Sequence, residues 1–300
     1  MTRMAVFLSN SLDSPIVLAM LLLYLLLGMA SLGVMLKTTP ASQLRLQVNA
    51  WWRIFPLVSV SLYLHPIGAI VLALFIGVLA ARELALHCSP ARSAFAAFCI
   101  GILALALLAG WFSLQLSMTA LAVLMAAQLA HFIARRQHSQ LLLLLFLFTC
   151  CGIGFITAFA TLPLSAALQR DWLFYLFAMT ALNDIAQFIT GKSFGKQKIA
   201  ARISPNKTWQ GLAGGMSVSA MLSLALGSYL QLAGAMQLAW LALLLSLGGF
   251  AGDLLFSAAK RFLGIKDFSQ LIPGHGGILD RVDSLVVTAP LLYFAIVFLH

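Results

Sequence analysis

Long apolar runs separated by short polar breaks restrict this chain to a membrane-spanning fold. Of its 300 residues, 62% are hydrophobic and 9% are charged, and the mean hydropathy is +1.01. Charged side chains are costly in hydrocarbon, and a helix crosses a bilayer in roughly 20 apolar residues. We therefore expect an all-α polytopic membrane protein with about nine or ten transmembrane helices, whose few charges lie in loops, at interfaces or in protein-lined cavities.

Nine apolar runs are long enough to cross the membrane as helices. They cover residues 14–36, 54–80, 95–112, 116–134, 141–162, 172–190, 209–230, 236–258 and 284–299. We expect 54–80 to break at His65-Pro66 into two short passes, because proline interrupts a helix. Both long basic loops, 37–53 and 192–207, then face the cytoplasm, as the positive-inside rule favours. A single crossing by 54–80 is the alternative, and it places these loops on opposite sides.

The chain divides into three parts by the character of its spans. Residues 1–50 form an extra N-terminal span and basic loop, because the first apolar run is too long for a signal peptide. Residues 51–170 form an N-terminal transmembrane bundle, and 171–300 form a C-terminal transmembrane domain that holds most of the polar motifs. The net charge of +10 suits anionic headgroups or nucleotides. No basic stretch carries the interleaved aromatics of a nucleic-acid reader.

Half of the acidic residues gather in one segment, 253–283. Four of the eight acids lie there, together with a glycine-rich turn, and the charged residues and histidine are Asp253, Lys260, Arg261, Lys266, Asp267, His275, Asp280, Arg281 and Asp283. Carboxylates supply hard oxygen ligands for divalent metals, while lysine and arginine neutralise phosphate charge. The segment therefore predicts metal and phosphate chemistry.

The spacing within this segment predicts shared helical faces. Four residues at i, i+4, i+7 and i+8 would line one face: Asp253, Ser257, Lys260 and Arg261. Asp280 and Asp283, three apart after the Gly276-Gly277 turn, would share a face at the entrance of the last span. The structural alternatives are a helix end with cations reaching to the interface, and carboxylates that cap a helix.

A second basic segment precedes the span that starts at Trp209. Five cations and no acid lie within residues 192–208: Lys192, Lys196, Lys198, Arg202 and Lys207. Lys207 offers a compact charge suited to phosphate, although the loop could also be a topological anchor alone. Upstream, Asp184 lies in mid-span beside Asn183 and Gln187. An intramembrane carboxylate indicates function by default, and a polar interhelical pair is the alternative.

Read together, these motifs closely resemble the signature of the phosphatidate cytidylyltransferases, also called CDP-diacylglycerol synthases. The resemblance rests on residues 191–198, 204–211, 252–254 and 272–284, and on Ser257-x-x-Lys260-Arg261 followed by Lys266-Asp267. It is strong over 172–300. Over 50–170 it extends only to a similar succession of spans, with Glu83 as the counterpart of a family acid.

The resemblance implies transfer of a cytidylyl group from CTP to phosphatidic acid or a related phospholipid, with Mg²⁺ and room for a second cation. It assigns catalysis to Asp253, Lys260, Asp280 and Asp283, and the metal to Asp253, Asp280 and Asp283. It assigns substrate binding to Asp184, Lys207, Ser257, Arg261, Lys266, His275 and Arg281. It also implies a bacterial inner membrane, an active site that faces the cytoplasm, and a homodimer, for which the sequence holds no independent motif.

Departures from the family pattern leave other functions open. Phe256 stands where the family usually has Glu, Ala259 where a larger apolar residue is common, and Gln187 where an aromatic often follows Asp184. Loss of an acid would weaken a metal shell or alter a contact behind it. The alternatives are a CTP-dependent polyprenol or phytol kinase, a non-catalytic lipid-binding relative, and a transporter with a midplane site at Asp184, Asn183 and Gln187. A transporter leaves the C-terminal motif unexplained.

Overall fold

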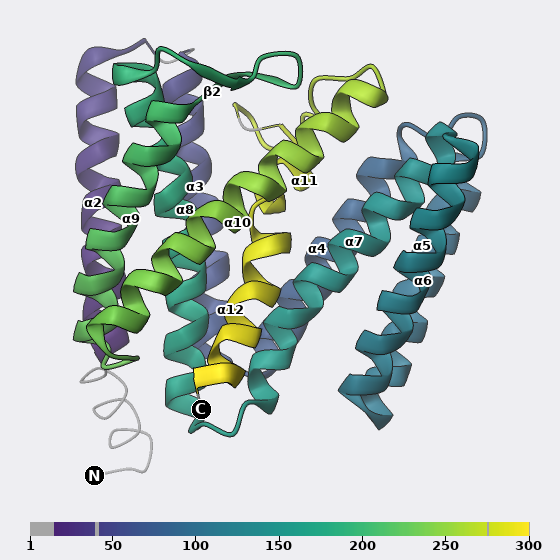
Figure 1. Cartoon of the computed structure of the whole chain (residues 1–300), viewed down its shortest axis with the longest axis horizontal. Helices are drawn as coiled ribbons and strands as arrows, with labels where there is room; N and C mark the ends of the chain where they lie inside the picture. The colour runs from purple at the N-terminus through teal and green to yellow at the C-terminus, as the bar shows by residue number, and fades with distance from the viewer. Residues whose placement is uncertain (1–14, 40–41, 275, 300) are drawn as a thin grey trace.

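A computed structural model describes residues 15–39, 42–274 and 276–299 as a bundle of helices (Figure 1). The helices are α2 Pro15–Lys37, α3 Gln43–Tyr63, α4 Ile67–Ala85, α5 Arg92–Phe112, α6 Leu114–Arg135, α7 His138–Ala158, η1 Phe159–Thr161, α8 Ala166–Phe194, α9 Trp209–Tyr229, α10 Ala235–Phe262, α11 Leu279–Val282 and α12 Leu285–Leu299. Within this part of the chain, nine helices are long and apolar enough to cross a membrane. The all-α polytopic membrane fold is confirmed.

The break in the apolar run 54–80 is present, but the helix before it differs from the expected pass. Helix α3 ends at Tyr63 and α4 begins at Ile67, so the interruption coincides with His65-Pro66. Helix α3 already begins at Gln43, however, so the basic loop expected at 37–53 is largely helical. The polar residues of α3 keep it outside the nine apolar spans of the described chain. Whether α3 crosses the membrane stays a prediction.

A short β-hairpin interrupts the helices between α8 and α9. Strand β1, Lys198–Ala200, pairs antiparallel with β2, Ser204–Thr208. The sequence analysis expected only a basic loop here, and strands this short leave no periodic pattern to detect. Thr208 ends β2 and also caps α9, because its hydroxyl accepts a hydrogen bond from the backbone N–H of Gly211 at 3.1 Å. The hairpin therefore holds the Lys207 segment in a defined position.

The polar motifs lie at one end of the bundle. Figure 1 shows the hairpin, the C-terminal end of α10 and the segment that follows it at the top, while the C-terminal end of α12 lies at the bottom. Residues 192–208 and 253–283, which are far apart in the sequence, therefore share an end.

The buried core lies among α4, α7, α8, α10 and α12. Its largest fully buried side chains include Trp172, Tyr175 and Phe146. By contrast, only 11%, 6% and 11% of the apolar windows of α2, α5 and α6 are buried in the bundle. Exposed apolar side chains are the expected surface toward lipid. Two of these well-packed helices, α8 and α10, carry residues of the polar motifs.

Candidate active site

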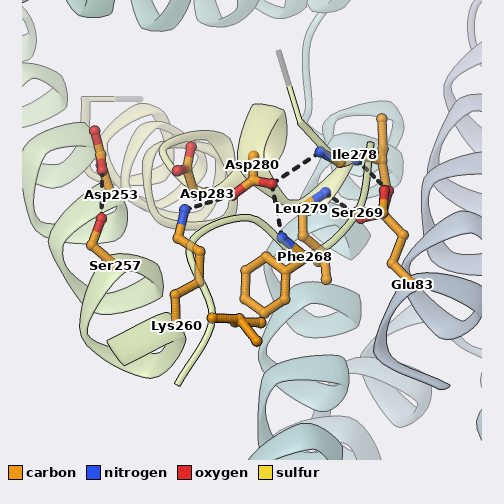
Figure 2. Close-up of polar contacts among 12 residues, drawn as sticks. Glu83, Asp253, Ser257, Lys260, Phe268, Ser269, Ile278, Leu279, Asp280 and Asp283 are labelled. Atoms are coloured by element: carbon orange, nitrogen blue, oxygen red, sulfur yellow. Dashed lines mark hydrogen bonds and ion pairs between the residues drawn. The ribbon is translucent and has the colours of Figure 1, made fainter. Parts of the chain in front are cut away.

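Asp253 on α10 joins two of the predicted motif segments. The Nζ atom of Lys207, from β2, lies 2.6 Å from Oδ2 of Asp253. The hydroxyl of Ser257, one helical turn further along α10, donates a hydrogen bond to Oδ1 of Asp253 at 3.2 Å. Figure 2 shows the Asp253 and Ser257 side chains pointing toward each other. The expected common face of these two residues is present, and Lys207 adds a cation from the hairpin.

Two further carboxylates lie around Asp253. Asp184 of α8 accepts a hydrogen bond from the Ser284 hydroxyl at 3.3 Å, and Asp283 accepts one from the Ser284 backbone N–H at 2.8 Å. Asp184, Asp253 and Asp283 all interact electrostatically with one another. Arg281 is exposed, but its positive charge attracts the carboxylates of both Asp184 and Asp283. Three carboxylates therefore share this part of the bundle with the positive charges of Lys207, Lys260 and Arg281.

Asp280 uses its carboxylate differently from Asp283. Its Oδ1 atom lies 2.5 Å from Nζ of Lys260, and its Oδ2 accepts hydrogen bonds from the backbone N–H groups of Phe268 and Gly277 at 3.2 and 2.9 Å (Figure 2). The side chain is only 4% exposed. Both oxygens are therefore occupied by donors of the protein itself. Asp280 fixes the segment before α11 through these hydrogen bonds. Its ion pair also ties Lys260, a predicted catalytic residue, to the same segment.

Glu83 holds the other end of the same segment from a distant helix. It lies on α4, is 3% exposed, and accepts hydrogen bonds from the Ser269 hydroxyl at 2.6 Å and from the backbone N–H groups of Ile278 and Leu279 at 2.7 and 3.1 Å. A Cβ atom at Gly277 would lie 2.4 Å from Oε2 of Glu83, so any larger residue there would displace the Glu83 carboxylate. From the sequence, Glu83 was expected only to be the counterpart of a family acid, with no contact assigned to it. Its place at the end of an apolar run was the available indication.

The remaining predicted residues do not all reach this centre. Arg261 is exposed and donates hydrogen bonds to the backbone carbonyls of Ile203 and Ile265 at 3.1 and 3.3 Å. Lys266 is also exposed, and it makes no hydrogen bond or ion pair with the residues that the structure describes. The prediction for His275 falls outside the described residues. The structure therefore brings Lys207, Ser257 and Lys260 to the acids, but not Arg261 or Lys266.

A comparison with known protein families shows to which family the chain belongs. The model described as "Cytidylyltransferase family" matches residues 45–299. The chain belongs to the cytidylyltransferase family. Helix α2 lies before the matched residues, and its role as an extra N-terminal span stays a prediction.

A comparison with individual proteins finds bacterial relatives. The chain is 46% identical over 119 residues to the phosphatidate cytidylyltransferase of Brucella suis, covering 40% of the chain and 44% of the relative. It is 41% identical over 128 residues to the phosphatidate cytidylyltransferase of Bacillus subtilis, covering 41% and 46%. It is also 45% identical over 122 residues to the uncharacterized protein YnbB of Escherichia coli, covering 41% of each. The matches thus span less than half the length of these relatives.

Phe256, the clearest departure from the cytidylyltransferase pattern, does not stand among the carboxylates. It is fully buried, and its ring lies 6.0 Å from that of Phe148 on α7 and 6.2 Å from that of Phe268. Phe268 in turn donates its backbone N–H to Asp280 and lies 5.6 Å from Nζ of Lys260. Phe256 therefore packs behind Asp280 and Lys260, at the position where the family resemblance led us to expect an acid.

Introducing the family acid as Phe256→Glu is expected to destabilise the protein. The change removes two ring contacts and buries a carboxylate, which should lower the free energy of unfolding by at least ~3 kcal/mol. Thermal unfolding of the purified protein in detergent measures this, with Phe256→Leu as the apolar control that should lose less. A Phe256→Glu variant as stable as the natural protein would show that a polar partner exists behind Asp280.

A buried amide joins the three helices that carry the site. The Oδ1 atom of Asn183 on α8 accepts hydrogen bonds from Gln187 at 3.2 Å, from Ser219 of α9 at 3.1 Å and from Ser246 of α10 at 2.6 Å. Asn183 is 2% exposed and Gln187 is 5% exposed. These amides therefore have a structural role. The transporter alternative is not needed to explain their presence within the span. Their hydrogen bonds hold α8 next to Asp184 against the middle of α9 and against α10 about two turns before Asp253.

Proposed function

We propose that this chain transfers a cytidylyl group from CTP to phosphatidic acid, giving CDP-diacylglycerol and pyrophosphate. The observation that carries the proposal is the meeting of Lys207 with Asp253, beside Asp184 and Asp283, at one end of the membrane spans. Such a site can neutralise and align two phosphate-bearing substrates, one of which is held in the membrane. The names of the Brucella and Bacillus relatives, phosphatidate cytidylyltransferases, support the same reaction.

The reaction needs alignment and charge neutralisation more than a general base. An oxygen of the lipid phosphate, already anionic, forms a bond to the α-phosphorus of CTP. The bond from that phosphorus to the bridging oxygen breaks, and pyrophosphate leaves with the electron pair. No proton has to move. Lys207 and Arg281 are placed to offset phosphate charge, and Lys260 contributes its charge while it holds Asp280.

The donor set around Asp253 fits a magnesium ion that arrives with the nucleotide. Within the described chain, no group of three or more acidic, histidine or cysteine side chains could hold a metal ion alone. Magnesium is usually held by one or two protein carboxylates, with phosphate and water oxygens as the other ligands. Asp253 and Asp283 would hold it, with Asp184 beside them. When bound, the ion would neutralise charge on the transferred group and on pyrophosphate.

The prediction that Asp280 also ligates the metal fits the structure less well. Its oxygens already meet one ammonium and two backbone N–H groups, in a side chain that is 4% exposed. A metal ion there would have to displace these donors in a nearly inaccessible side chain, whereas the Asp253 side chain, which meets Lys207 and Ser257, is 27% exposed. We therefore propose that Asp280 is a positioning residue, and that the metal ligands come from the carboxylates around Asp253.

The site is proposed to face the cytoplasm. Most of the described lysine and arginine residues lie at the end of the bundle that carries the hairpin and the segment after α10, and a positive excess marks the cytoplasmic side. CTP is available there. A bacterial inner membrane fits the bacterial relatives, and the expected homodimer stays a prediction.

The purified protein, incubated with phosphatidic acid, magnesium and CTP labelled at the α-phosphorus, tests the proposal. Cytidylyl transfer places the label in lipid and releases unlabelled pyrophosphate. A CTP-dependent lipid kinase would instead place a γ-phosphate label in lipid and release CDP, which separates the two reactions when both labels are used. No α-label in lipid, or the same yield after magnesium is chelated, would contradict the proposal.

A further inference from the structure

A cavity of about 430 Å³, widely open to the outside, lies at the C-terminal end of α8, next to the Lys207 segment. Its lining residues are Ser193, Phe194, Gly195, Lys196 and Gln210. They come from two of the motif segments that carry the family resemblance, yet none of them belongs to the predicted site. The proposed function therefore gives this cavity no ligand so far.

The backbone around this cavity is held by internal hydrogen bonds. Oε1 of Gln210 accepts hydrogen bonds from the backbone N–H groups of Lys196 and Gln197 at 3.0 and 3.1 Å. The N–H of Gly195 donates to the carbonyl of Gly191 at 3.0 Å. Phosphate-binding loops need free backbone N–H groups, and three consecutive ones are used here. The wall is thus preformed, but it is not built as a phosphate nest.

The cavity groups that make no internal hydrogen bond suit a planar heteroaromatic ring. The side chain of Phe194 is 70% exposed and offers an aromatic face on which a base can stack. The amide nitrogen of Gln210 makes no hydrogen bond to any described residue, because only its oxygen bonds to the backbone. An amide donor beside an aromatic face can recognise the acceptor edge of a base. Ser193 and Lys196 add further donors.

The cavity adjoins the proposed catalytic site through Thr208. A Cβ atom on Gly195 would lie 2.8 Å from Oγ1 of Thr208, so the cavity wall rests against this residue. Lys207, immediately before Thr208, reaches Asp253 with its ammonium group at 2.6 Å. A nucleotide with its base in the cavity would have to extend its phosphates past Thr208 to reach Lys207.

We infer that this cavity is the subsite for the pyrimidine base of the nucleotide substrate, an inference that rests on the proposed function. It assigns base contacts to Phe194 and Gln210, and it leaves phosphate and metal contacts to Lys207 and the carboxylates. It predicts that changes in the cavity alter nucleotide binding, while lipid binding and the chemical step stay unchanged.

The variants Gln210→Glu and Phe194→Leu test the inference by steady-state kinetics. Glutamate keeps an oxygen acceptor for the two backbone N–H groups but removes the amide donor. Each variant should raise KM for CTP on the order of 10-fold, with kcat and KM for phosphatidic acid within about 2-fold of the natural protein. The control is Phe188→Leu, which removes an exposed ring of the same helix that does not line the cavity.

The outcomes separate this inference from the proposed function. An active natural protein with unchanged KM for CTP in both variants would overturn the base subsite alone, as would a rise in KM for phosphatidic acid instead. An equal rise in the Phe188→Leu control would also overturn it. A natural protein that neither uses CTP nor binds it in equilibrium dialysis would overturn both. Thermal unfolding confirms that each variant is folded before its kinetics are compared.

Discussion

Asp253→Asn is expected to lower the rate of CDP-diacylglycerol formation by on the order of 10²- to 10³-fold, the range found when one preorganised electrostatic contact to a transition state is lost. The carboxylate forms an ion pair with Lys207 at 2.6 Å and accepts a hydrogen bond from Ser257 at 3.2 Å. It also interacts electrostatically with the carboxylates of Asp184 and Asp283. Asparagine keeps the shape and one acceptor oxygen but removes the charge. A magnesium ion would then be held mainly by Asp283.

Initial rates at several magnesium concentrations measure the effect, because a metal ligand should also raise the magnesium requirement. The matched control is Asp171→Asn on the same helix as Asp184. Asp171 lies next to Arg170 at 3.8 Å, near the other end of α8. The control should retain close to full activity. Equal losses in the two variants would mean that charge removal acts through stability, and undiminished turnover by Asp253→Asn would refute its role.

Glu83→Ala should cause the second large loss, in activity and in stability together. The change leaves the Ser269 hydroxyl and the backbone N–H groups of Ile278 and Leu279 without their acceptor. Each unsatisfied buried donor costs ~1–3 kcal/mol, so the free energy of unfolding should fall by several kcal/mol unless water enters. The start of α11 would no longer be held, and Asp280 and Asp283 follow directly.

A graded series distinguishes anchoring from a general loss of folding. Ser269→Ala removes one of the three donors and should have the smallest effect, Glu83→Gln should be intermediate because one amide oxygen remains, and Glu83→Ala should be the most severe. Thermal unfolding and turnover are measured on the same preparations. If stability fell along the series while the activity per folded molecule stayed constant, Glu83 would have no positioning role.

Most of the fold could be predicted from apolar run length, because hydrocarbon imposes the same requirement on every span. The structure departs where polar residues enter a helix. Helix α3 extends back to Gln43 through residues that were expected to form a loop, and α8 extends to Phe194. Hydropathy alone cannot detect such extensions, since a helix continues past the apolar region wherever capping and tertiary contacts support it.

The site was predictable in its residue types but only partly in its contacts. Spacing along α10 correctly placed Ser257 beside Asp253, because one helical turn separates them. Spacing could not show that Asp280 would meet two backbone N–H groups, or that Arg261 would turn to the carbonyl of Ile203. Glu83 was hardest to place, since a pattern within one segment contains no information on partners in another.

The attachment of Ile278 to Glu83 joins residues 195 positions apart. During biosynthesis the carboxylate enters the bilayer with α4, long before the segment that it will hold has been translated. Glu83 therefore lacks its final hydrogen-bond partners until the last part of the chain has been synthesised. A fragment limited to residues 171–300 would contain all the predicted catalytic side chains and still lack the group that orders them, so expressing it with a separate fragment that supplies α4 should be necessary to regain an organised site.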